Sequence, residues 1–198
     1  MNSQKLANII LFILMAMTPL FSQRSLTRAS IGMEYGIWKP SSLDDYPSQP
    51  LKNVAGADPY WGLTLTTPVI QSHSIRISIM QWRQEGLEEV GLEAATLRHL
   101  AVDLKYYVLP DYTVSPYASY GLAAIWSQEE PLNNTHERIP PDRAGWGFNL
   151  GAGIDFMLYR HLGLGVEYQY LYAVFAKRVG MTTNYSGPKI SFKFFFIF

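Results

Sequence analysis

The sequence of 198 residues contains no cysteine. This absence excludes disulfides, thiol catalysis, iron–sulfur clusters and cysteine-ligated zinc. A net charge is also missing, because 16 Lys and Arg residues balance 16 Asp and Glu residues. No basic run stands out as a patch for phosphates. We therefore expect no nucleic-acid partner, no metal site, no cofactor and a single domain, as the length suggests.

Long apolar runs are absent beyond the first 22 residues. Lys5 supplies a positive charge, residues 6–21 are mostly apolar, Pro19 interrupts the run, and Ser22 is a small residue suited to a cleavage site. The run is short for a membrane-spanning helix, which needs about twenty apolar residues. The pattern predicts that residues 1–22 form a cleaved signal peptide and that residues 23–198 are exported. An uncleaved anchor is the alternative.

Alternation of large apolar residues with small or polar ones is strongest between residues 145 and 175. It runs from Gly147 to Leu158, breaks around Arg160-His161, and resumes at Leu162. A period of two predicts strands, and the short break predicts a hairpin. Both strands exceed ten residues, whereas strands of soluble proteins usually have about five or six.

The same alternation recurs along the rest of the chain. It predicts further strands at residues 28–38, 60–70, 74–83, 94–109, 113–126 and 187–198, which makes eight strands with the hairpin. The connections alternate between long segments (39–59, 84–93, 127–144, 177–186) and short turns (71–73, 110–112, 160–161).

Bulky apolar residues share one face of each predicted strand, and Gly, Ala, Ser and charged residues share the other. A soluble barrel such as a lipocalin would expose its polar face and enclose the apolar one. Long strands with short turns at one end and long loops at the other are instead typical of outer-membrane barrels. The sequence predicts an all-β protein, an eight-stranded antiparallel up-and-down transmembrane β-barrel, with both termini in the periplasm.

Two segments resemble a known family. Residues 150–156 (LGAGIDF) and 164–170 (LGVEYQY) resemble the penultimate hairpin of the small OmpA/OmpX/OmpW-like outer-membrane barrels. Residues 190–198 (ISFKFFFIF) resemble the aromatic-ended last strand by which the barrel assembly machinery recognises its clients. The resemblance implies a location in the outer membrane of a Gram-negative-type bacterium. It also implies an assembly signal formed by Phe192, Phe194, Phe196 and Phe198.

The predicted inner face carries four acids, four bases and one histidine. Side chains just fill the lumen of an eight-stranded barrel, so charges inside it must pair. A salt-bridged plug is one interpretation, and a narrow polar conduit is the other. We expect His99 to form hydrogen bonds in the lumen, or to tune a gate with pH. The nine residues are Glu34, Arg76, His99, Asp103, Lys105, Asp155, Glu167, Lys189 and Lys193.

Three functions are open at this point. The first is a non-enzymatic envelope protein whose outer loops contact lipopolysaccharide or a partner protein, including a larger outer-membrane complex. The second is a narrow pore for ions or small solutes. The third is a lipid A-modifying enzyme, which needs a histidine at the outer rim to activate a nucleophile. His136 is the only histidine in a predicted outer loop, and no regular element holds it next to a nucleophile. We therefore expect no catalytic residues.

Overall fold

The computed structural model describes residues 28–40, 58–70, 72–85, 87, 91–110, 112–131, 143–180 and 182–198. None of these residues belongs to a helix with the length and apolar character needed to cross a membrane. The described part contains nine strands: β1 (Ser30–Trp38), β2 (Asp58–Ile70), β3 (His73–Glu85), β4 (Leu92–Tyr107), β5 (Val114–Pro131), β6 (Arg143–Tyr159), β7 (Leu162–Val179), β8 (Thr182–Asn184) and β9 (Gly187–Ile197).

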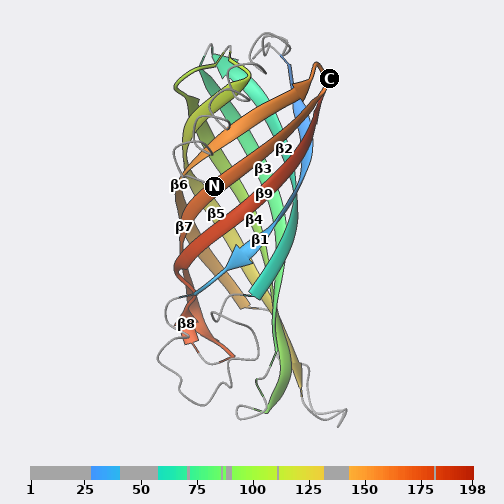
Figure 1. Cartoon of the computed structure of the whole chain (residues 1–198). Helices are drawn as coiled ribbons and strands as arrows, with labels where there is room; N and C mark the ends of the chain where they lie inside the picture. The colour runs from blue at the N-terminus through green and yellow to red at the C-terminus, as the bar shows by residue number, and fades with distance from the viewer. Residues whose placement is uncertain are drawn as a thin grey trace, which may run out of the picture.

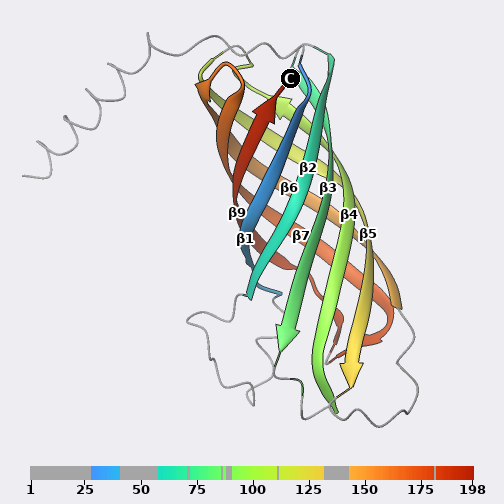
Figure 2. The same cartoon turned by 90° about the vertical axis from the view of Figure 1, so that its right-hand side faces the viewer.

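Eight of the strands close into a barrel. Each strand from β1 to β7 pairs antiparallel with the next, β7 pairs with β9, and β9 pairs with β1. The short β8 pairs only with β7, beyond the end of the ladder that joins β7 to β9. Both views show long strands inclined to the barrel axis (Figures 1 and 2). The predicted eight-stranded antiparallel barrel is confirmed.

The two ends of the barrel differ. The short turns between β2 and β3, β4 and β5, and β6 and β7 lie at the same end as the C-terminus (Figure 2). β8 lies at the opposite end (Figure 1), where β1, β3, β5 and β7 end and β2, β4 and β6 begin. We call these the turn end and the loop end.

Several predicted boundaries at the loop end are wrong. β5 continues to Pro131 and β7 to Val179, although the sequence predicts loops from residues 127 and 177. β8 falls inside the predicted loop 177–186. The reason is that backbone pairing continues past the last outward apolar residue, where side chains such as Gln128 and Glu130 no longer show the alternation.

Apolar side chains cover the outside of the barrel. Leu122, Leu150 and Phe192 are each more than half exposed, and their strand neighbours point into a packed interior. Exposed aromatic rings lie near both ends, with Trp61, Trp146 and Tyr172 toward the loop end. An apolar band about 25 Å tall between aromatic girdles is the surface that a membrane barrel presents to lipid. The lipocalin-like alternative is therefore wrong.

A charge on this band is expected to destabilise the barrel in lipid. Leu63, near the middle of β2, points outward and is 48% exposed. We expect Leu63→Arg to lower the free energy of unfolding by about 2–4 kcal/mol, because guanidinium is poorly solvated at the bilayer midplane. Val69→Arg, on the same face near the turn end, should cost about 0–1 kcal/mol. Urea unfolding in lipid vesicles measures both, and equal losses would contradict the lipid-facing assignment.

Candidate functional site

The inside of the barrel is the candidate site, since it holds the buried charges. All nine charged or titratable side chains singled out in the sequence lie there, each between 1% and 6% exposed. They come from β1, β3, β4, β6, β7 and β9, so they converge from all around the barrel. We call the eight charged members, without His99, the ionic layer.

Arg76 is the centre of the ionic layer. Its Nε and Nη2 donate to Oδ2 of Asp103 at 3.0 and 2.7 Å. Its Nη1 and Nη2 donate to Glu167 at 2.5 and 3.1 Å. Ser119 donates a further hydrogen bond to Glu167 at 2.6 Å, and Asn149 donates one to Asp103 at 3.0 Å. One guanidinium thus joins β3 to β4 and, across the lumen, to β7.

A second group lies beside Asp155. Lys105 contacts this carboxylate at 2.9 Å, and the hydroxyl of Tyr107 donates to it at 2.7 Å. The ammonium group of Lys105 also lies 3.6 Å from the centre of the Tyr117 ring. A cation over an aromatic face is attracted by the ring quadrupole, most strongly where water is excluded. The charge of the Lys105 ammonium is therefore compensated by the Asp155 carboxylate and by the Tyr117 ring.

Lys193 connects the two groups. Its ammonium forms an ion pair with Glu167, and it also donates to the Tyr117 hydroxyl at 3.3 Å. Arg76 and Lys193 thus share one carboxylate. Such a connected network compensates buried charge better than isolated pairs, whose desolvation can outweigh their attraction.

The remaining two charges meet through Tyr60. The Tyr60 hydroxyl donates to Glu34 at 2.5 Å, and the Lys189 ammonium lies 4.7 Å from the centre of the same ring. Lys189 also donates to Gln169 at 3.4 Å. Within the described part of the chain, no carboxylate oxygen lies within 4.0 Å of the Lys189 ammonium. The least compensated cation of the layer is therefore Lys189.

His99 lies four residues before Asp103 on β4, on the loop-end side of that carboxylate. It is 2% exposed, and its cross-strand neighbours are Met80 and Ile125. Within the described residues, neither ring nitrogen has a hydrogen-bond partner. His99 borders an apolar zone that includes Met80 and Ile125, and its expected hydrogen bonds stay a prediction.

That apolar zone closes the loop end of the lumen. The rings of Trp38 and Trp82 meet edge to face with centroids 5.0 Å apart, and the Tyr185 ring lies 6.4 and 6.0 Å from them. Phe175 contacts Tyr185 at 5.7 Å. We call these four side chains the aromatic lid. All are at most 6% exposed, so the lid belongs to the core and not to the surface.

A turn after β7 brings Tyr185 into the lid. Gly180 has φ = 52°, a backbone conformation that glycine adopts without steric cost. Its N–H donates to Glu129 at 2.6 Å, which anchors the turn to β5. The Tyr185 hydroxyl donates to the carbonyl of Val179 at 2.8 Å. The chain thus folds back over the barrel mouth and returns to β9.

The aromatic lid is absent from the sequence-based site. Trp38 and Trp82 could have been found, because they continue the inward series of Gly36 and Met80 by two residues. Tyr185 carries no such signal, since it lies in a segment predicted as a loop.

At the turn end, a smaller apolar cluster of Met157, Phe195 and Ile197 covers the ionic layer from the other side.

Two sequence-based assignments concern residues that the structure does not describe. His136 and the signal peptide of residues 1–22 lie outside the described residues. Within the described part, no three His, Asp or Glu side chains are grouped so that they could hold a metal ion.

Solved structures share the fold at low sequence identity. OprG from Pseudomonas aeruginosa matches with a TM-score of 0.61 and 16% identity over 90% of this chain and 98% of its own. Neisserial surface protein A matches with 0.57 and 12% over 88% and 98%. Ail of Yersinia pestis, in complex with the heparin analogue sucrose octasulfate, matches with 0.53 and 15% over 86% and 97%.

Sequence comparison identifies the family. No curated protein matches the chain significantly. The model of the family described as "Outer membrane protein beta-barrel domain" matches residues 9–196, which is most of the chain. The predicted resemblance to small outer-membrane barrels is confirmed, and membership implies a location in the outer membrane. The closed barrel, its apolar exterior and this match together show that the chain belongs to the outer membrane protein beta-barrel domain family.

Proposed function

We propose that the protein is a non-enzymatic, non-conducting barrel that serves as a rigid membrane anchor. Its loop end faces the cell exterior and engages lipopolysaccharide or a partner protein, including a larger outer-membrane complex to which it is an accessory subunit. Both termini are periplasmic in this proposal. The short turns and the C-terminus share one end, which is the periplasmic arrangement in barrels of this kind.

One observation carries the proposal: buried side chains fill the lumen at three levels. The ionic layer spans the barrel from Arg76 to Glu167, the aromatic lid lies above it, and the cluster at Met157 lies below it. An eight-stranded barrel has an interior just wide enough for its own side chains. A continuous path for ions would need several of these groups to move together.

Planar-bilayer recording tests the proposal. We expect purified, refolded protein to produce no steady single-channel steps at up to 100 mV or so, because a charge in transit would have to displace paired side chains in a low-dielectric interior. Urea-unfolded protein added at the same concentration controls for defects in the bilayer. Reproducible steps of one size, absent from that control, would defeat the proposal.

The pore hypothesis has one observation in its favour. In the part of the chain that the structure describes, both ring nitrogens of His99 and the amide nitrogen of Gln169 are buried without partners, and buried polar groups of this kind commonly bind ordered water. A hydrated centre shielded by the aromatic lid would be the starting point of a conduit. The same recordings decide between the two functions.

We further propose that β9, together with Phe198 directly after it, carries the assembly signal. Phe192, Phe194, Phe196 and Phe198 all point outward and are between 47% and 63% exposed. Their positions are open to the barrel assembly machinery until β9 pairs with β1 and lipid covers them.

Partner capture after mild detergent extraction tests the proposed role of the loop end. Ail, a barrel of the same fold, has been solved in complex with the heparin analogue sucrose octasulfate.

A further inference from the structure

The segment that follows β7 lies at the loop-end mouth of the barrel and leads to β9 (Figure 1). Its described residues are 179, 180 and 182–186, and we call them the cover. The cover pairs with β7 through Thr182 and Asn184 of β8. The ladders of the barrel wall are longer, since each spans nine residues or more. Backbone pairing therefore holds the cover more weakly than it holds the wall.

Tyr185 is the part of the cover that enters the lumen. It is 0% exposed, and its ring contacts the other three rings of the aromatic lid. Its N–H donates to the carbonyl of Ala173 at 2.8 Å, and the N–H of Ala173 donates to the Ser186 hydroxyl at 3.0 Å. The cover thus closes the mouth by inserting one ring, and Ala173 of β7 fixes the position of that ring.

Glu129 joins the cover to β5. Its Oε1 accepts the Gly180 N–H at 2.6 Å, and its Oε2 lies 3.5 Å from Nη2 of Arg143, at the start of β6. The Glu129 side chain is 6% exposed, so both contacts are largely shielded from water. Hydrogen bonds to an ionised acceptor are short and about twice as strong as neutral ones. One carboxylate thus ties the cover to two strands of the wall.

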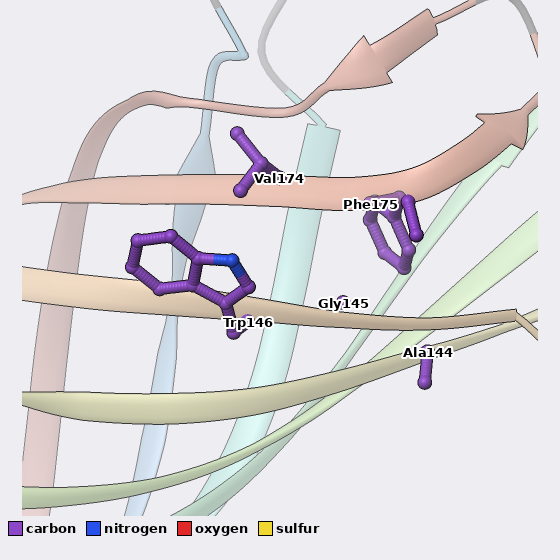
Figure 3. A pocket seen from close by; sticks show the side chains of 6 residues that line it. Ala144, Gly145, Trp146, Val174 and Phe175 are labelled. Atoms are coloured by element: carbon purple, nitrogen blue, oxygen red, sulfur yellow. The ribbon is translucent and has the colours of Figure 1, made fainter.

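The end of β7 lies outside the wall ladders. Its pairing with β9 ends at Leu171 and its pairing with β6 ends at Phe175. Beyond Phe175, β7 bends away from β6, and a hollow of 380 Å³ lies between the two strands (Figure 3). The lining of this hollow is uncharged and consists of Ala144, Gly145, Trp146, Val174, Phe175 and Ala176. The cover and the last residues of β7 can therefore move without breaking a pair of the wall ladders.

We propose that the cover opens as a unit while the barrel stays folded, and that Glu129 is the latch that keeps it closed. Segments with few contacts to the rest of a protein open locally at a lower free energy than global unfolding. Opening withdraws Tyr185 from the aromatic lid and exposes the rings of Trp38 and Trp82 at the mouth. The ionic layer stays paired below them, so the open state is not a pore. The inference goes beyond the proposed function and does not depend on it.

Thiol labelling tests the cover, because the chain has no cysteine of its own. Ala173→Cys places one thiol at a position that is 0% exposed and contacts the cover. Ala101→Cys places it at another position of 0% exposure, in the middle of β4. In folded protein in detergent micelles, we expect a water-soluble maleimide to label Ala173→Cys slowly, and Ala101→Cys only when the whole barrel unfolds.

Removal of the latch should speed the labelling. We expect Glu129→Ala to raise the labelling rate of Ala173→Cys by about tenfold, since the lost charge-assisted bond shifts the opening equilibrium by that factor. Glu129→Gln keeps an acceptor oxygen without the charge and should raise the rate by about threefold. Neither should change the labelling of Ala101→Cys. Glu130→Ala is the matched control, because the next carboxylate of β5 is 37% exposed and contacts Arg83 at 2.8 Å. It should leave the rate within about twofold.

Hydrogen exchange of protein without an engineered thiol gives a second measurement. The amides of Gly180 and Tyr185 are hydrogen-bonded in the closed cover. We expect Glu129→Ala to speed their exchange, while amides in the middle of β4 keep their rate. This measurement keeps the test valid even where Ala173→Cys itself disturbs the cover.

Three results would overturn the inference. They are no acceleration by Glu129→Ala in either measurement, equal acceleration by Glu129→Ala and Glu130→Ala, and parallel acceleration at residues 173 and 101, which would indicate global unfolding. Opening of the cover is independent of conductance. A silent bilayer without opening of the cover would leave the proposed function standing, and steady channels would defeat that function whatever the cover does.

Discussion

Replacing Arg76 by methionine is expected to destabilise the folded barrel by about 3–5 kcal/mol. The guanidinium makes four hydrogen bonds with Asp103 and Glu167. Both carboxylates are 1% exposed, so they cannot recover their hydration. Glu167 keeps its ion pair with Lys193, whereas Asp103 keeps a neutral hydrogen bond from Asn149. Methionine keeps the length and much of the volume of the side chain. The loss therefore measures uncompensated charge and not an empty cavity.

Arg83 provides a matched control on the same strand. It also contacts two carboxylates, Glu130 at 2.8 Å and Glu85 at 3.4 Å, but its side chain is 44% exposed. Exposed ion pairs contribute about 0–1 kcal/mol, because water compensates each charge. Equilibrium unfolding by urea in lipid vesicles, followed by tryptophan fluorescence, compares Arg83→Met with Arg76→Met. Similar losses for the two would show that the ionic layer is solvated in the folded protein.

Trp82→Ala is expected to lower the free energy of unfolding by about 3–5 kcal/mol. The Trp82 ring is 1% exposed and packs against Trp38 and Tyr185 in the aromatic lid. Removing it leaves a cavity that a closed barrel cannot collapse to fill, since the strand ladder holds the wall in place. The loss should also release Tyr185, and the turn at Gly180 should become more susceptible to proteases.

Trp61 is the control for the lid. It has the same side chain, but it points outward from β2 and is 53% exposed. Trp61→Ala removes contacts with lipid that neighbouring acyl chains can replace, so we expect it to cost about 1 kcal/mol or less. The same urea titration and a limited proteolysis time course compare the two variants. A loss for Trp61→Ala as large as that for Trp82→Ala would contradict a packed lid.

The sequence by itself determined the number of barrel strands, which is eight, their pairing order, and the face to which most of their side chains point. These features are local, because a strand in lipid must alternate between the membrane and the lumen at every residue. Glu34 and Met33 illustrate this, since one is 6% exposed inside the barrel and its neighbour is 62% exposed outside it. Alternation weakens beyond the apolar band, and there the predicted ends of β5 and β7 are wrong.

Only the tertiary structure decided which inward residues meet. Arg76 and Glu167 are 91 residues apart in the chain and come from β3 and β7, and their contact depends on how far the sheet is staggered when it closes. Tyr185 reaches the lid because a turn folds back over the mouth. The ladders that β7 forms with its two neighbours end at different residues, at Phe175 toward β6 and at Leu171 toward β9. Neither closure nor the end of a ladder leaves a periodic trace in sequence, because both depend on residues brought together from distant strands.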